Sequence, residues 1–177
     1  MKLTDGEKII IAMLADVHKA LKIEGETDVK HLMESIYSGN LWSLDWDWQG
    51  LLGAKETPDH VVKETADILD MWSLLETAYE RLEEADKDKV KAANHGHGPV
   101  FSGFDGNNDD HFGVAKHFIE VMDRFAHFEG RDLNSHSQMS LPRYRQMYPK
   151  FEELRAKLAD RDLTADEIIS VLQAEAA

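Results

Sequence analysis

A stripe of mostly apolar residues between positions 61 and 82 is the feature that most constrains how this chain can fold. The stripe recurs at the three- and four-residue steps of an α-helix and continues for about seven turns. Just before it, Thr57 is a good N-cap and Pro58 suits the first helical turn, where a missing N–H costs nothing. The sequence therefore predicts one long helix over about residues 58–85, whose apolar side other helices must cover. Its members are Val61, Thr65, Ile68, Leu69, Trp72, Leu75, Tyr79 and Leu82.

The first 40 residues carry two shorter amphipathic helices. Thr4 and Glu7 have the spacing of a capping box, in which each side chain bonds the other residue's backbone N–H. A second helix is predicted from Asp28 as N-cap to Gly39, which fits the left-handed position after a helix. The first helix is expected to present one apolar stripe, made of Ile9, Ile10, Met13, Leu14, Val17 and Leu21.

The carboxyl-terminal part is also predicted to be helical. One helix should begin near Asp109, and a second should begin at Ser140 with Pro142 in its first turn. Pro149 is expected to kink or split that second helix, because it removes one backbone donor and clashes with the preceding turn. A last helix should begin at the capping box formed by residues 164–167.

Periodicity disappears after the long helix, where glycine, asparagine and proline predict a long Gly-rich loop over about residues 86–108. Loops this long inside a compact domain are either functional or mobile. We therefore expect an all-α, multi-helix single domain over residues 1–177. Within it we expect a helical hairpin region at 1–85 and a second helical cluster at 100–177.

The segment between residues 40 and 53 contains three of the four tryptophans. Its alternation of large residues suits a strand, whereas a three- and four-residue spacing suits a helix. We favour the helix, because no second strand-like run is available to pair with a strand. Trp42, Trp46 and Trp48 lie so close together that some must point away from any one core face. Large rings are usually core residues, but an exposed aromatic patch would mark a surface for self-association or a protein partner.

Composition excludes several classes of function. Acidic residues outnumber basic ones 34 to 20, and the formal net charge of −14 disfavours nucleic acid and anionic membranes as partners. The chain has no cysteine, which excludes disulfides and thiol catalysis. No stretch approaches the roughly 20 apolar residues of a membrane span. The apolar run at 9–14 is too short for a secretory signal, so a cytoplasmic location is the expectation.

Histidines in and just after the Gly-rich loop are the candidate metal ligands. His95, His97 and His111, with nearby aspartates, supply the nitrogen and oxygen donors that a divalent transition metal accepts. Flexible glycines do not bring such donors together, so we favour a solvated polar loop and expect neither metal nor cofactor. A calcium loop is rejected, because Asp110 stands where glycine is needed and Lys116 stands where glutamate is needed.

Common catalytic motifs of proteases, kinases, dehydrogenases and α/β-hydrolases are absent from the sequence. One weak signal is the spacing of Arg131 and His136, which is similar to the Arg-polar-x-x-x-His motif of helical HEPN ribonucleases. That resemblance implies an arginine that stabilises phosphorane charge and a histidine that moves protons. The pattern is short and falls in a predicted loop, and the acidic composition opposes RNA.

Five motifs between residues 60 and 172 resemble those of the YfbU-like family of bacterial proteins. The resemblance implies an all-helical fold and supplies no reaction. Within the motifs, Asp105, Arg124 and His127 are the polar residues most worth testing. Their structural alternative is that Asp105 caps the next helix and His127 is hydrogen-bonded at a helix end. The motifs are Ile68-Leu69-Asp70-Met71-Trp72, Phe101-Ser102-Gly103-Phe104-Asp105, Arg124-Phe125-Ala126-His127-Phe128, Tyr144-Arg145-Gln146-Met147 and Leu163-Thr164-Ala165-Asp166-Glu167-Ile168-Ile169.

Two functions of different class remain. The first is a non-catalytic cytoplasmic helical interaction protein that self-associates into a homo-oligomer. The alternative is a hydrolase or metal-independent ribonuclease, which would use Asp105, Arg124 and His127, or Arg131 and His136. The two are separated by whether those side chains converge in a concave pocket.

Overall fold

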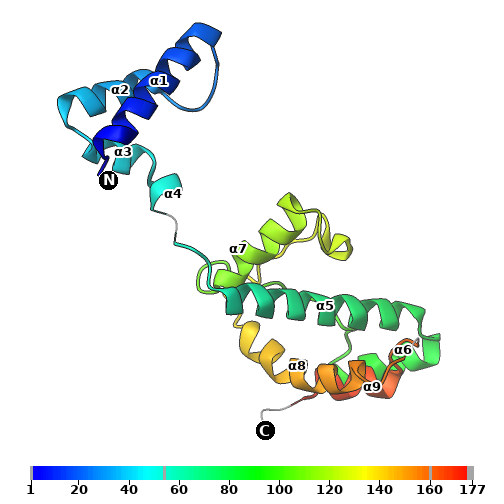
Figure 1. Cartoon of the computed structure of the whole chain (residues 1–177). Helices are drawn as coiled ribbons and strands as arrows, with labels where there is room; N and C mark the ends of the chain where they lie inside the picture. The colour runs from blue at the N-terminus through cyan, green and yellow to red at the C-terminus, as the bar shows by residue number, and fades with distance from the viewer. Residues whose placement is uncertain (1, 54, 160, 175–177) are drawn as a thin grey trace. The chain divides into compact units, whose positions relative to one another are not determined.

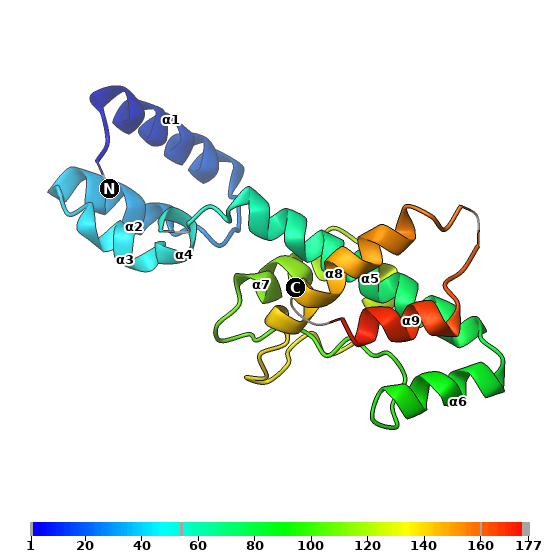
Figure 2. The same ribbon diagram turned by 90° about the horizontal axis from the view of Figure 1, so that it is seen from below.

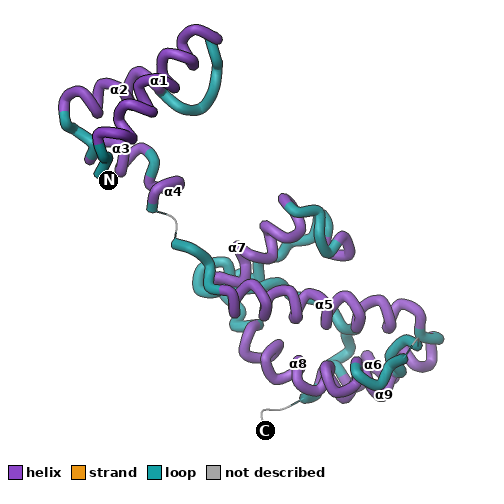
Figure 3. Tube along the Cα trace, viewed as in Figure 1, coloured by secondary structure: helices purple, strands orange, loops and turns teal. Residues whose placement is uncertain are grey.

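The computed structural model describes residues 2–53, 55–159 and 161–174. The regular elements of these residues are all helical, and Figure 3 shows helices joined by loops with no strand among them. The all-α prediction is therefore confirmed. The chain divides into two compact units, residues 1–56 and 57–177. The division falls near residue 56 and not between 85 and 100 as expected, whereas the assignment of 1–177 to one domain stays a prediction.

The first unit contains four helices in its described residues, and each packs against the next along the chain (Figure 1). The first helix begins at the predicted capping box, in which Thr4 accepts from the Glu7 N–H and Glu7 accepts from the Thr4 N–H at 2.7 Å. Asp28 caps the second helix and Gly39 ends it with a φ of 74°. The tryptophan segment is helical, as predicted. The four helices are α1 (Asp5–Leu21), α2 (Val29–Ser38), α3 (Trp42–Asp47) and α4 (Gln49–Leu52).

The second unit is built around the long helix α5, Asp59–Arg81, which contacts α7, α8 and α9 (Figures 1 and 2). The predicted long central helix is thus present. Helix α6 packs on α9 at one end of this unit. The remaining elements are α6 (Glu84–Ala93), α7 (Asp110–Lys116), a π-helical turn (His117–Val121), a 3-10 turn (Ala126–Phe128), α8 (Leu141–Arg155) and α9 (Ala165–Leu172).

Helix α6 corrects the predicted boundaries of the long helix and the Gly-rich loop. The long helix ends at Arg81 because Leu82 and Glu83 adopt extended backbone angles. Residues 84–93, of which 86–93 were expected to belong to the loop, are helical. This helix has too few apolar residues to show a helical period. It is stabilised by contact with α9 and by the burial of Val90.

Pro149 was expected to kink or split α8; it lies inside the helix and does not split it, while the kink stays a prediction. Tyr144, Met147 and Phe151 on the same helix are fully buried against the core. This packing keeps the helix continuous, because burial of three large side chains outweighs the loss of one backbone hydrogen bond.

An aromatic cluster forms the centre of the second unit, and the loop after α6 supplies part of it. Trp72 of α5 lies 5.4 Å from the ring of Tyr144, while Phe101 lies 5.4 Å from Phe104 and 5.2 Å from Phe128. All five rings are buried. The segment around Phe101 is therefore core structure, although its composition is typical of an exposed loop.

Gly103 allows this loop to lie directly against a second loop. Its φ is +83°, and a Cβ atom there would stand 2.3 Å from the carbonyl oxygen of Leu133. The Phe104 N–H donates to that same oxygen at 2.9 Å. Ser140 and Tyr144 both donate their hydroxyl groups to the Gly103 carbonyl, at 2.7 and 3.1 Å. Only glycine satisfies both the backbone angle and the close approach.

We predict that Gly103→Ala lowers the free energy of unfolding of the second unit by about 2–4 kcal/mol, because it adds backbone strain and a clash with backbone. Gly113→Ala is the matched control. It lies in α7 with nothing within 4 Å of its Cβ position, so it should raise stability by about 0.5–1 kcal/mol. Urea denaturation measures both changes. Equal changes in the two variants would contradict the role given to Gly103.

Candidate functional site

Glu76 of α5 is a buried carboxylate of the second unit that takes part in four hydrogen bonds. Each carboxylate oxygen accepts two of them. One oxygen accepts from the Phe101 N–H at 2.6 Å and from Arg131 at 3.1 Å. The other lies 2.6 Å from Arg131 and 2.6 Å from Nε2 of His127. We call Glu76, His127 and Arg131 the Glu76 centre.

Charge and burial compete at the Glu76 centre. Burial acts to raise the pKa of Glu76, but hydrogen bonds from Arg131, the Phe101 backbone and His127 outweigh it, so this pKa lies below its usual value. The ionised carboxylate has four donors on two oxygens. A general base needs a free lone pair facing its substrate, and this carboxylate has none to spare. The centre therefore ties two loops to α5.

Glu64, twelve residues earlier on α5, has the same kinds of partner. Arg145 binds it through two hydrogen bonds of 2.7 Å, and His111 lies 2.7 Å from it. The Arg145 guanidinium is the largest cause of a Glu64 pKa of about 2. This contact holds α7 and α8 against α5. Sequence reasoning missed both glutamates. The available signal was an acidic residue inside the apolar stripe, since Glu64 and Glu76 stand at helical spacing among its members.

The candidate metal ligands do not come together. His111 is buried and bound to Glu64, whereas His95 and His97 are exposed in the loop after α6. Among the residues with described positions, no three histidine, aspartate or glutamate side chains are arranged to hold a metal ion.

Asp105 does not cap the helix that follows it, contrary to the structural alternative given above. Its side chain accepts from the Asn107 N–H at 2.9 Å and from the Asn108 amide at 2.6 Å, so it closes its own turn. Asp109 occupies the N-cap position of α7.

The other catalytic candidates separate in space. Arg131 turns toward Glu76, whereas His136 lies at the surface and bonds Asp132 at 2.8 Å. The ribonuclease-like pair is therefore not assembled. His127 and Arg131 do lie together, but both are hydrogen-bonded to the Glu76 carboxylate and help to fill its acceptor positions. Arg124 is exposed and shares no described contact with these groups.

The first unit presents a different kind of feature, a large apolar surface. No residue of α1 is buried. Ala12 and Ala15 are partly buried on the helix, which packs on α2. The predicted stripe, here called the α1 apolar face, has exposed fractions between 50% and 68%. It consists of Ile9, Ile10, Met13, Leu14, Val17 and Leu21.

The tryptophan helices add a second exposed surface to the first unit. Trp42 is 60% exposed and Trp46 is 78% exposed, with their rings edge to face at 5.9 Å. Trp48 is half-buried. Two of these three rings therefore point away from the core, as their close spacing in the sequence predicts. Leu51 and Leu52 extend this surface along α4.

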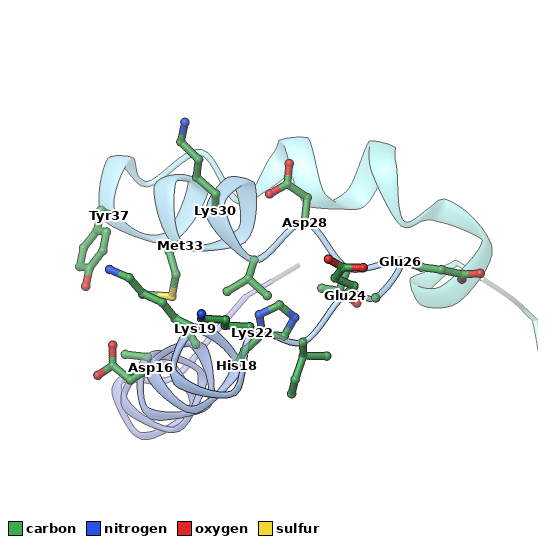
Figure 4. A pocket seen from close by; sticks show the side chains of 16 residues that line it. Asp16, His18, Lys19, Lys22, Glu24, Glu26, Asp28, Lys30, Met33 and Tyr37 are labelled. Carbon is green, nitrogen blue, oxygen red and sulfur yellow. The ribbon is translucent and has the colours of Figure 1, made fainter.

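A groove of about 1150 Å³ lies between α1 and α2 (Figure 4). Met33 and Tyr37 line its apolar side. Its rim carries both signs of charge, including Lys19, Lys22 and Asp28. This mixture selects no ligand by charge.

Comparison with protein families matches the chain to the YfbU domain over residues 1–174. The chain belongs to the YfbU family. Comparison with curated proteins finds no match. The sequence motifs that resembled this family lie after residue 60, but the match extends over the first unit as well. The exposed surfaces of the first unit are therefore part of the YfbU domain.

We predict that Glu76→Gln lowers the free energy of unfolding of this YfbU domain by about 2–3 kcal/mol, because it leaves the partly buried Arg131 without its counter-charge. The matched control is Glu80→Gln, one turn further along the exposed side of α5, which should change stability by less than about 0.5 kcal/mol. Guanidinium denaturation measures both. A similar loss of stability in the two variants would show that the contacts of Glu76 with its partners do not stabilise the fold.

We predict that acid removes the contribution of Glu64 to stability. Its pKa of about 2 lies below the usual 4.5, so its stabilising contribution is complete above pH 4.5 and is lost as the pH falls toward 2. Glu64→Gln should therefore be less stable than the parent chain at pH 7, by on the order of 2–3 kcal/mol, and the difference should shrink in acid. Thermal unfolding from pH 7 to pH 2.5 measures this, and a constant difference is the contrary result.

Proposed function

We propose that this chain is a non-catalytic helical interaction protein that self-associates through its first unit, residues 1–56. The supporting observation is the composition of that unit's interior. Among its described residues, Leu44 is the one buried large apolar side chain. The apolar residues that would normally form a core are instead spread over its surface.

The size of the first unit makes this exposure costly. A domain of about 60 residues is marginally stable even with a proper core. Soluble monomers also rarely expose a contiguous apolar patch larger than a few hundred Å². The α1 apolar face joins six large side chains on one helix. Such a surface is typical of one that a neighbouring molecule covers.

Covering the α1 apolar face can offset the free-energy cost of association. Complete burial of one large aliphatic side chain contributes about 1.5–3 kcal/mol, so covering a side chain that is half exposed contributes about 1 kcal/mol. Six such side chains on each of two copies amount to about 12 kcal/mol. This is comparable to the 4–15 kcal/mol that association costs in lost freedom. Association therefore depends on most of the face, and one charge placed in it should be enough to prevent pairing.

Trp42 and Trp46 support a second role, the binding of a protein partner. Aromatic residues are enriched in interfaces because a large apolar ring is buried with little loss of side-chain entropy. The excess of acidic residues disfavours nucleic acid as the partner. No described helix is long and apolar enough to cross a membrane. A cytoplasmic location is part of the proposal.

The hydrolase alternative lacks geometric support among the described residues. It requires Asp105, Arg124, His127, Arg131 or His136 to share a pocket with free functional groups. His127 and Arg131 are instead bound to Glu76, and Asp105 closes its own turn. The interaction function is therefore the better supported of the two.

We predict that light scattering after size-exclusion chromatography gives the whole chain a mass of at least two copies. Val17→Glu and Leu14→Glu should each shift it toward one copy, because both place a charge in the α1 apolar face. Val121→Glu, at a 65% exposed valine of the second unit, is the matched control and should leave the mass unchanged. A single-copy mass at every concentration would refute the proposal.

A further inference from the structure

Charges are distributed unevenly along α1. Its first turn carries Asp5 and Glu7, with Lys8 paired to Asp5 at 3.1 Å, and its last turns carry Asp16, His18 and Lys19. Lys22 follows as the C-cap residue. The acidic end coincides with the positive end of the helix dipole and the basic end with the negative end. The two ends of the helix are therefore electrostatically complementary to each other.

We infer that α1 pairs with α1 of a second copy in the antiparallel direction, about a two-fold axis near Met13. This inference rests on the proposed self-association and specifies its geometry. A parallel pair would place Asp5 and Glu7 against their own copies. An antiparallel pair places each acidic end beside the basic end of the other copy, and it also opposes the two helix dipoles.

The α1 apolar face is suited to this symmetry. Ile10 and Val17 lie on opposite sides of the adjacent pair Met13 and Leu14, so a two-fold axis at that point brings large side chains onto large side chains. An isologous contact of this kind requires that one surface complement itself. The face does so in its apolar pattern, whereas Lys19 and Lys22 lie beside it, on the groove between α1 and α2. Ala12 and Ala15, the partly buried alanines of α1, are not part of the α1 apolar face. That face is therefore free for another molecule.

Two small residues on the same side of α1 make the direction measurable. Gly6 and Ala20 each stand seven residues from Met13, which is close to two helical turns, so all three share one side of the helix. Gly6 and Ala20 are about 21 Å apart along the helix. The Cβ position of Gly6 has nothing within 4 Å, and the chain has no cysteine of its own. A single cysteine placed at either position can therefore carry a nitroxide label.

The test measures distances between labels in Gly6→Cys alone, in Ala20→Cys alone and in an equimolar mixture of the two. In the antiparallel pair, each pure sample holds its labels at opposite ends, about 21 Å apart along the axis. The mixture should add a short distance near the 8–10 Å separation of packed helices. A parallel pair reverses this result, with short distances in both pure samples and the long one added by mixing. Val17→Glu should abolish the short distance in the mixture.

The outcomes separate this inference from the broader proposal. A single-copy mass for the parent chain refutes both, including when the second unit of the same chain covers α1. A paired chain with the parallel pattern, or with no short distance in any sample, refutes the antiparallel inference and leaves self-association standing. A pair that survives Val17→Glu but dissociates in Trp42→Ala with Trp46→Ala also refutes it, since the tryptophan surface would then hold the copies together.

Discussion

Two carboxylates on one helix hold later segments of the second unit against that helix. Glu64 and Glu76 lie at positions of the apolar stripe of α5, where an unpaired charge would be strongly destabilising. Each is compensated by a histidine and an arginine from later in the chain. These partners come from α7, α8 and the turns between them. The buried charge of Glu76 thus fixes where two loops without hydrophobic periodicity lie, which apolar contact alone does not specify.

Sequence periodicity predicted the elements that bury a continuous stripe. Helix α5 and both capping boxes follow from local rules, because their signals lie within a few turns of each other. Helix α6 was missed because its residues are mostly charged and its stability comes from contact with α9. The loop around Phe101 was also misjudged. Its glycines indicate a turn, while its phenylalanines are core residues only once distant Tyr144 and Trp72 are in place.

The candidate site shows the same limit. Sequence reasoning selected His127 and Arg131, but it paired them with residues nearby in the chain. Their actual partner, Glu76, is 51 residues before His127. Periodicity also predicted the apolar stripe of α1, yet an amphipathic pattern says only that a face is suited to burial. It does not say what covers the face, and no described residue of the first unit does.

The uneven distribution of buried apolar side chains between the two units also affects how the chain folds during synthesis. Synthesis proceeds from the amino terminus, and domains generally fold as they emerge. The first 56 residues leave the ribosome with one buried large apolar side chain among those described, whereas the aromatic cluster that stabilises the second unit is translated later. The first unit is thus translated before the second, with an apolar helix face that none of its own described residues covers. In polysomes, neighbouring nascent chains would display that helix to one another before either was released.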